Sequence, residues 1–276
     1  AALGTLTFGW LFTGERPWLL AAVVAMDWFI VNLLNRVVDL PEDRLNRIVG
    51  TDFVARHRRA LVAVGVGLLL LSLPAVHLLC PAITPWRLGY HLLGTAYNRP
   101  LLPGLPRLKT IYFVKNSASA LGFVITLFAY PLATHHAAGG GLPPGIDGTT
   151  LVWTLAFFVA FELSYEVIYD LRDIAGDRAA GVATYGAVHG QQVAQHIAEA
   201  LAAGALLIAV LGWLTDRLPW RIAVMAAAPI AQVILVRRFL RRGLRASDCV
   251  VLTWLGAAML ALYNVWVALG LPGVGP

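Results

Sequence analysis

The sequence is poor in charged residues. Only 13% of its 276 residues are Asp, Glu, Lys or Arg, whereas 59% are hydrophobic. A soluble domain carries about 25% charged residues, so the composition excludes an ordinary soluble domain. The mean hydropathy of +0.72 indicates instead a polytopic membrane protein embedded in a lipid bilayer. We expect one all-α transmembrane domain over residues 1–276.

Several familiar signatures are also missing. There is no Walker loop and no GxGxxG, HExxH or GxSxG motif, so nothing indicates a P-loop, a dinucleotide fold, a zinc protease or an α/β-hydrolase. The two cysteines, Cys80 and Cys249, are predicted near opposite membrane faces, too far apart for a disulfide. The net charge of +6 resides in short loops, which excludes nucleic acid as a partner.

Apolar runs predict nine transmembrane helices, because about 20 apolar residues cross a bilayer. The expected helices are 1–13, 17–40, 60–80, a shorter helix ending near 97, 110–132, 150–171, 190–214, 219–237 and 248–270. The first is partial, and we expect it to be the second half of a longer helix. Pro41 is expected to stop the second helix, and residues 134–148 to form the longest loop.

Positive charge is concentrated on one side of the predicted membrane domain. Most of the 21 Lys and Arg residues fall in loops on that side. The exceptions are Arg16, Arg87, Arg217 and Arg221. Cytoplasmic loops carry an excess of Lys and Arg, so we expect this side to face the cytoplasm, from a prokaryotic inner membrane.

Two clusters of metal-ligand side chains end the second and sixth predicted helices. They are Asn35, Asp39 and Asp43 in the first and Asp170, Asp173 and Asp177 in the second. Spacings of three and four residues place such side chains on one helix face, and carboxylate oxygens are ligands for hard cations such as Mg²⁺. A pair of Mg²⁺ ions is a suitable partner for a diphosphate. The matched positions suggest two pseudo-repeated four-helix halves plus a ninth helix around a central cavity, with a site between the halves.

Basic side chains in the same loops are candidates for binding a diphosphate. We expect Lys109 and Lys115, the only lysines, to act directly on the diphosphate. Further candidates on the cytoplasmic side are Arg99, Arg107, Arg172 and Arg178, together with Asn35 for substrate binding. Each of these basic residues could equally serve only to set the orientation of the chain in the membrane. The basic run at 237–245 is expected to be a lipid-facing loop.

Aromatic side chains recur at helical spacing on the sixth predicted helix. They are Trp153, Phe157, Phe158, Phe161 and Tyr165, followed by Tyr169. Aromatic faces attract cations, and an allylic diphosphate that ionises forms a carbocation. Phe161 and Tyr169 are therefore expected to bind substrate and Tyr165 to act in catalysis, although aromatic packing explains the same pattern.

Ionisable residues are also predicted within the membrane, where a charge is costly and commonly functional. Asp27 lies in the middle of the second helix and needs an internal partner. His91 is expected to have a packing role. Glu162 and Glu166 lie in the sixth helix, and Glu166 has the spacing to join the ligands of a metal ion.

Taken together, these residues resemble the UbiA superfamily of intramembrane prenyltransferases. The resemblance covers almost the whole chain. The first family motif, NDxxDxxxD in many members, matches at Asn35, Asp39 and Asp43, and the second, a YxxxKDxxDxxxD-like string, matches at Tyr165, Asp170, Asp173 and Asp177. The segments YNRPLLPGLPRLKTIYFVKN at 97–116 and DIAGDRAAGVAT at 173–184 are also similar to the family.

The resemblance implies nine transmembrane helices and two Asp-rich motifs that bind Mg²⁺ and an isoprenyl diphosphate. Arg36 stands where many members have Asp, and Tyr169 where many have Lys. The Pro-x-Arg-Pro segment that often follows the first motif is absent. These departures fall in the region that helps to shape the acceptor side, so they leave the acceptor open.

The sequence thus predicts an Mg²⁺-dependent prenyltransferase. It would ionise an isoprenyl diphosphate, with Asp39 and Asp173 central to the metal sites, and transfer the prenyl chain to an aromatic or other lipophilic acceptor. A UbiA-type terpene cyclase, in which the cation attacks its own double bonds, is the close alternative. An ion-coupled transporter using Asp27, Glu162 and Glu166 is an alternative of another class, but it leaves the paired clusters unexplained.

Overall fold

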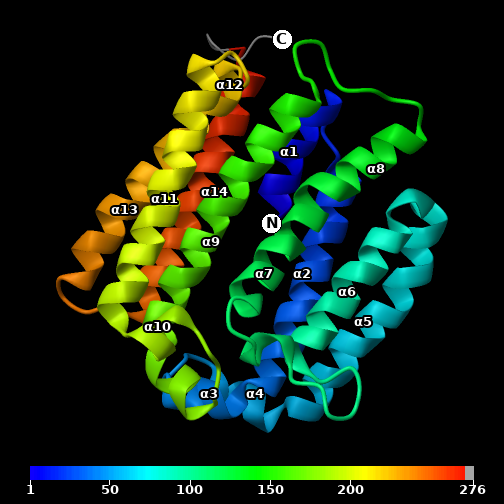
Figure 1. Cartoon of the computed structure of the whole chain (residues 1–276). Helices are drawn as coiled ribbons and strands as arrows, with labels where there is room; N and C mark the ends of the chain where they lie inside the picture. Colours follow the sequence, from blue (N-terminus) through cyan, green and yellow to red (C-terminus); the bar gives the residue numbers. More distant parts are fainter. Residues whose placement is uncertain (271–276) are drawn as a thin grey trace. The chain divides into compact units, whose positions relative to one another are not determined.

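The computed structural model describes residues 1–270, which form helices and contain no β-strand. The chain divides into two compact units. The first consists of Ala1–Gly141 and Asp173–Val188, and the second of Leu142–Arg172 and His189–Pro276. The long helix α9 (Gly148–Ala179) begins in the second unit and ends in the first (Figure 1).

Most of the helices belong to the first unit. They are α1 (Ala2–Thr13), α2 (Trp18–Val38), α3 (Leu40–Leu45), α4 (Thr51–Arg56), α5 (Arg58–Leu79), α6 (Thr84–Asn98), α7 (Val114–Val124) and α8 (Tyr130–Ala137). Short 3-10 turns lie at Pro81–Ile83 and Leu108–Thr110, and a π-helical segment at Ile125–Ala129 joins α7 to α8. The helices α3 and α4 and the loop between α6 and α7 lie at one end of this unit (Figure 1).

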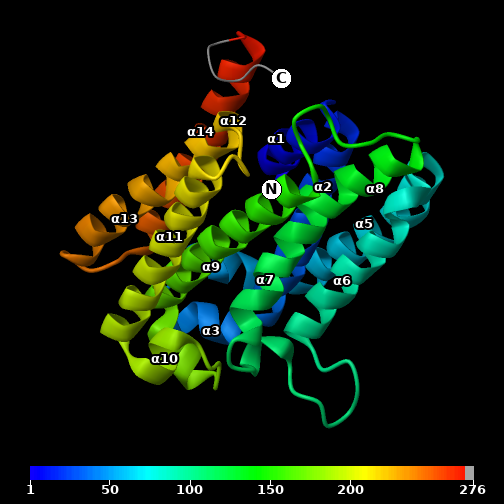
Figure 2. The ribbon, with the colours of Figure 1, turned by 45° about the horizontal axis from the view of Figure 1, so that its top comes forward.

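The second unit contains most of α9 together with the C-terminal helices. These are α11 (Gln191–Leu214), α12 (Trp220–Ala223), a 3-10 turn at Val224–Ala226, α13 (Ala227–Leu240) and α14 (Ala246–Ala268). The short helix α10 (Tyr185–His189) precedes α11. Figure 2 shows α11 and α13 running side by side. A buried row of alanines on α11, including Ala198, Ala202 and Ala205, permits this close helix packing.

Within residues 1–270, seven helical segments are long and apolar enough to cross a membrane. They are Trp18–Val38, Arg58–Leu79, Val114–Ala137, Gly148–Ala179, Gln191–Leu214, Trp220–Leu240 and Ala246–Ala268. The shorter helices α1 and α6 lie where the partial first helix and the short fourth helix are expected. The structure therefore confirms the predicted all-α membrane architecture. Cys80 and Cys249 are both free, as expected.

Three predicted helix boundaries are wrong. Helix α2 ends at Val38, and Pro41 lies in the first turn of α3 rather than stopping a helix. Proline is tolerated there because the first backbone N–H groups of a helix have no intrahelical partner. The fifth span continues to Ala137, into the predicted loop, and the sixth continues to Ala179.

A buried ion pair connects the helices of the first unit. Arg87 on α6 donates hydrogen bonds of 2.7–3.0 Å to both carboxylate oxygens of Asp27 on α2. Ser72 on α5 contacts the same guanidinium, while His91 and the Tyr130 hydroxyl contact the same carboxylate. Asp27 thus has the internal partner that the sequence predicts. The sequence counts Arg87 only among the positive charges of the non-cytoplasmic side, whereas in the structure it is 1% exposed and pairs with Asp27.

Candidate active site

The first acidic motif lies where α2 passes into α3. Asp39 separates the two helices, and its backbone N–H bonds the carbonyl of Asn35 at 2.9 Å. The N–H of Asp43 bonds the carbonyl of Asp39 at 2.8 Å. The four-residue hydrogen-bond spacing therefore continues through the break between α2 and α3.

Basic side chains of the first unit neutralise this motif. Lys109 donates to the carboxylates of both Asp39 and Glu42, with a distance of 2.7 Å to Glu42. Arg107 lies 3.6 Å from Glu42. Arg36 binds Asp43 at 2.5 Å, so the arginine that replaces an expected acid serves as an internal counter-ion.

The carboxyl group of Asp43 has a raised pKa. Burial is the main cause that raises its pKa to about 6. The nearby carboxylates of Asp39, Asp173 and Glu42 also raise the pKa, while Arg36 lowers it. The contribution of Asp173 places part of the second motif close to the first within this unit. A cluster of this kind favours an added positive charge.

The second acidic motif is part of a helix rather than a loop. Asp170, Asp173 and Asp177 all lie within α9, at spacings of three and four residues that place them on one helix face. The Nζ atom of Lys115 lies 3.2 Å from Asp177. The backbone N–H of Gly176 donates a 2.9 Å hydrogen bond to the side chain of Asn46, which directly follows α3.

The remaining candidate basic residues have different surroundings. Arg178 donates to the backbone carbonyls of Ala187 and Gly186, at 2.9 and 3.4 Å, and thereby connects the end of α9 to α10. Arg99 caps the end of α6 and is exposed. Among the predicted diphosphate ligands, Lys109 lies beside Asp39, Lys115 beside Asp177 and Arg107 beside Glu42.

The predicted aromatic row is present on the part of α9 that belongs to the second unit. The ring of Phe161 lies 6.2 Å from that of Phe157 and 5.2 Å from that of Tyr165, and Tyr165 lies 6.4 Å from Tyr169. The Tyr165 hydroxyl donates to the carbonyl of Leu252 at 3.1 Å. This hydrogen bond connects α9 to α14.

Tyr169 is held in the same way. Its hydroxyl donates to the carbonyl of Cys249 at 3.0 Å and contacts the hydroxyl of Thr253. The guanidinium of Arg172 lies 5.7 Å from the centre of the Tyr169 ring, so this ring already attracts a cation within its own helix.

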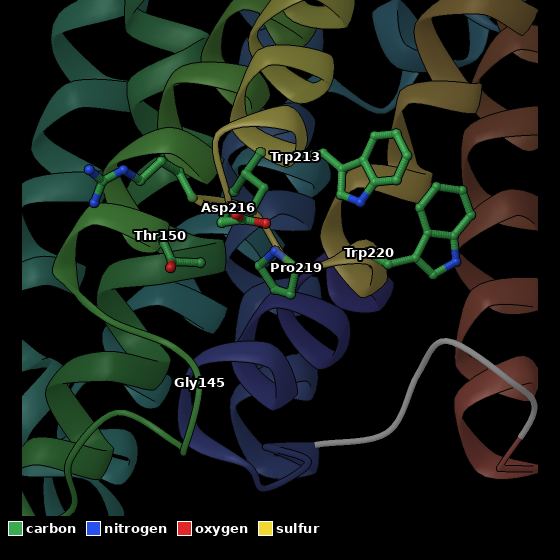
Figure 3. A pocket seen from close by; sticks show the side chains of 8 residues that line it. Gly145, Thr150, Trp213, Asp216, Pro219 and Trp220 are labelled. Atoms are coloured by element: carbon green, nitrogen blue, oxygen red, sulfur yellow. The ribbon is translucent and has the colours of Figure 1, made fainter.

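A cavity of about 210 Å³ lies elsewhere in the second unit (Figure 3). It is formed by the start of α9 and the turn after α11, and its lining includes Thr150, Trp213, Asp216 and Trp220. None of the candidate site residues lines it. Its position at the N-terminal end of α9 separates it from Asp170 by most of that helix.

Comparisons with known proteins identify the family. A model of the UbiA prenyltransferase family matches residues 2–255. The chain belongs to this family. A search of curated protein sequences finds no match.

Two solved structures of UbiA homologues from Archaeoglobus fulgidus have a similar fold. The one bound to DMAPP and Mg²⁺ is 17% identical, with a TM-score of 0.67 over 96% of this chain and 92% of that chain. The one bound to GPP and Mg²⁺ is 16% identical, with a TM-score of 0.66 over 96% and 93%. At this identity the likeness establishes the fold.

Three residues near the acidic motifs of this UbiA family member were not predicted from the sequence to belong to the site. Glu42 lies between two predicted ligands and shares Lys109 with Asp39. Asn46 and Gly176 connect the two motifs. An acid three residues after Asp39 is a visible signal for Glu42, whereas the contact of Asn46 with Gly176 is tertiary and has no local sequence signal.

Proposed function

We propose that this protein is an Mg²⁺-dependent prenyltransferase that takes an isoprenyl diphosphate as donor and a lipophilic or aromatic compound as acceptor. The observation that carries the proposal lies within one unit: the first acidic motif is close to Asp173 of the second, Lys109 contacts Asp39, and Lys115 contacts Asp177. Family membership and the Mg²⁺ and prenyl diphosphates bound by the two Archaeoglobus fulgidus homologues support it.

The residues present suit a divalent cation. Among residues 1–270, the Oδ1 atom of Asn35 is buried and has no hydrogen-bond partner. No three His, Cys, Asp or Glu side chains in that range are placed to hold a metal ion by themselves. This matches Mg²⁺, which is commonly bound through one or two carboxylates, water and substrate phosphates rather than by an all-protein cage. When bound, Mg²⁺ neutralises the negative charge that develops on the leaving diphosphate.

Metal binding is assigned to the two motifs. The proposed ligands are Asn35, Asp39, Asp43, Asp170, Asp173 and Asp177. Lys109 and Lys115 then bind diphosphate oxygens, because their ammonium groups already lie beside the carboxylates that would share the cation. Arg107, next to Glu42, adds positive charge on the same side.

In the proposed reaction, the allylic carbon–oxygen bond breaks and its electron pair leaves with the diphosphate. The prenyl cation is stabilised by the faces of Phe161, Tyr165 and Tyr169. A nucleophilic atom of the acceptor forms the new bond to the allylic carbon and loses a proton. The acidic motifs face the cytoplasm in this proposal, in keeping with the distribution of Lys and Arg.

One experiment tests the activity and its alternatives. Purified protein and Mg²⁺ are incubated with allylic diphosphates of several chain lengths, with and without aromatic acceptors, and products are identified by mass spectrometry. Prenylated acceptor supports the proposal. A cyclised hydrocarbon formed without acceptor would establish a terpene cyclase instead.

The transporter alternative is disfavoured by the surroundings of Asp27. Its two carboxylate oxygens are occupied by Arg87, His91 and Tyr130, so it is not an open ion ligand. Ion uptake into proteoliposomes without release of diphosphate would contradict the prenyltransferase proposal.

A further inference from the structure

Asn46 joins the two acidic motifs of the first unit. Its side-chain Oδ1 accepts a 2.9 Å hydrogen bond from the backbone N–H of Gly176, which is 130 residues away in the sequence. Asn46 lies three residues after Asp43, and Gly176 lies three residues after Asp173. The contact therefore connects the backbone about one helical turn beyond a proposed metal ligand on each side.

The absence of a side chain at Gly176 gives the Asn46 amide the space to make this contact. A Cβ atom at position 176 would lie 2.3 Å from Nδ2 of Asn46 and 2.6 Å from its Oδ1 and Cγ atoms. Any side chain at this position must therefore displace the Asn46 amide. Because glycine is unfavourable within a helix, its presence in α9 is explained by the close approach of Asn46.

An uncharged side chain is suited to this position between the two acidic motifs. Asn46 is uncharged, so it fixes the backbone of α9 without adding negative charge beside Asp43 and Asp173. A lysine or arginine there would compete with a metal ion for the carboxylates, and an acid would add to their repulsion. Movement of α3 against the end of α9 would change the separation of the two acidic motifs.

We propose that Asn46 is a positioning residue, which sets the separation of the two acidic motifs through its hydrogen bond to Gly176. This inference rests on the proposed function, since the separation matters for a site that binds Mg²⁺ and a diphosphate through both motifs. Asn46 is not one of the proposed metal ligands. Residues that orient metal ligands in this way affect metal affinity by about 10–100-fold.

The position of α3 against α9 is measured first. Spin labels are attached to cysteines at Leu45 and Ala179, which are both exposed, in the full chain lacking Cys80 and Cys249. The dipolar interaction between the labels should give a narrow distance distribution in this parent protein. Asn46→Ala should broaden it, because this substitution removes the oxygen that accepts the Gly176 N–H.

A double substitution tests the partnership with Gly176. Gly176→Ala should broaden the distribution as much as Asn46→Ala does. The two changes together should be no worse than either alone, because both remove the same contact. Additive broadening would overturn the assignment of Gly176 as the partner.

The functional test is the Mg²⁺ dependence of diphosphate release. Asn46→Ala should raise the half-saturating Mg²⁺ concentration by about tenfold or more, while turnover at saturating Mg²⁺ changes much less. Asn264→Ala, which removes another amide from the second unit, is the control. If Asn46→Ala leaves the Mg²⁺ dependence unchanged, Asn46 is not a positioning residue.

The two measurements separate this inference from the proposed function. If the parent protein releases no diphosphate from any allylic diphosphate, the proposed function fails. The label distances still show whether Asn46 holds α3 against α9. A narrow distribution in Asn46→Ala would overturn the inference even in a fully active enzyme.

Discussion

Lys109 forms ion pairs with two carboxylates at the first motif. It is 2% exposed, and its ammonium group contacts the carboxylates of Asp39 and Glu42. A buried charge is costly unless it is paired, so this lysine and these acids hold one another in place. A cation that binds Asp39 must compete with Lys109, which is then available to a diphosphate oxygen.

Replacing Lys109 should therefore have opposite effects on the two ligands. Lys109→Met removes the competing charge, so Mg²⁺ or Mn²⁺ alone should bind more tightly. It also removes a diphosphate ligand, so an allylic diphosphate should bind more weakly by roughly tenfold or more, as for loss of a charge-assisted hydrogen bond. Calorimetric titration with the metal alone, and then with the diphosphate, measures both.

The matched control is Arg241→Met. Arg241 lies just after α13 in the second unit and is exposed, so its loss should change neither affinity. Equal effects of the two substitutions on diphosphate binding would show that Lys109 acts only through topology or general charge.

Asp39 and Asp173 belong to different motifs but to one proposed metal site. Asn keeps the shape of each side chain and removes one negative charge. Transition-state stabilisation by a metal ion is worth several kcal/mol, so Asp39→Asn and Asp173→Asn should each slow diphosphate release by roughly a hundredfold or more. The double variant should be far less impaired than the product of the two effects, because residues that act as a unit are not additive.

Asp147→Asn is the control for these charge changes. The Asp147 carboxylate accepts a hydrogen bond from the N–H of Thr150 at the start of α9, and Asn caps a helix about as well as Asp. Its effect on release should be small over an Mg²⁺ titration. Near-normal release from intact Asp39→Asn or Asp173→Asn protein would remove that motif from the mechanism.

At the scale of helices, the sequence predicts the spans well and their ends poorly. Long apolar runs determine that Arg58–Leu79 and Gln191–Leu214 are helical. Hydropathy reports where the membrane ends, however, and a helix can continue into water. The segment from Arg172 to Ala179 is polar yet remains part of α9, because its Asp, Arg and Ala residues are compatible with a helix.

The ion pair of Asp27 with Arg87 is the main polar connection between α2 and α6. Removing one partner leaves an uncompensated buried charge, which costs about 3–5 kcal/mol. Asp27→Asn and Arg87→Met should each lower the unfolding temperature in detergent strongly. The double variant should be destabilised by less than the sum, because it carries no unpaired charge.

Arg59→Met is the control for loss of an arginine. Arg59 is exposed near the start of α5, so its replacement should leave the unfolding temperature nearly unchanged. Strict additivity of Asp27→Asn and Arg87→Met would contradict the interpretation of the pair as a mutually dependent unit.

For the whole molecule, the acidic motifs could be predicted from the sequence because each is a local pattern of residues. The residues that pair with them could be predicted only in part. Lys109 and Lys115 are visible as basic residues in a loop, but their pairing with Asp39 and Asp177 spans 70 and 62 residues. The pairing of Arg87 with Asp27 was not predicted, because the two residues are 60 positions apart and only the packing of α6 against α2 brings them together.

The charge distribution predicts the orientation of the whole chain in the membrane. The loop after α3 precedes a run of arginines, while the loop before α9 has none. A single cysteine at Val49, which is 88% exposed, should therefore react with a membrane-impermeant reagent from the cytoplasmic side. A single cysteine at Gly148 should react from the opposite side. Both are placed in a variant lacking Cys80 and Cys249, and that parent without added cysteines supplies the background. Labelling of both positions from the same side would contradict the topology, since an odd number of predicted spans lies between them.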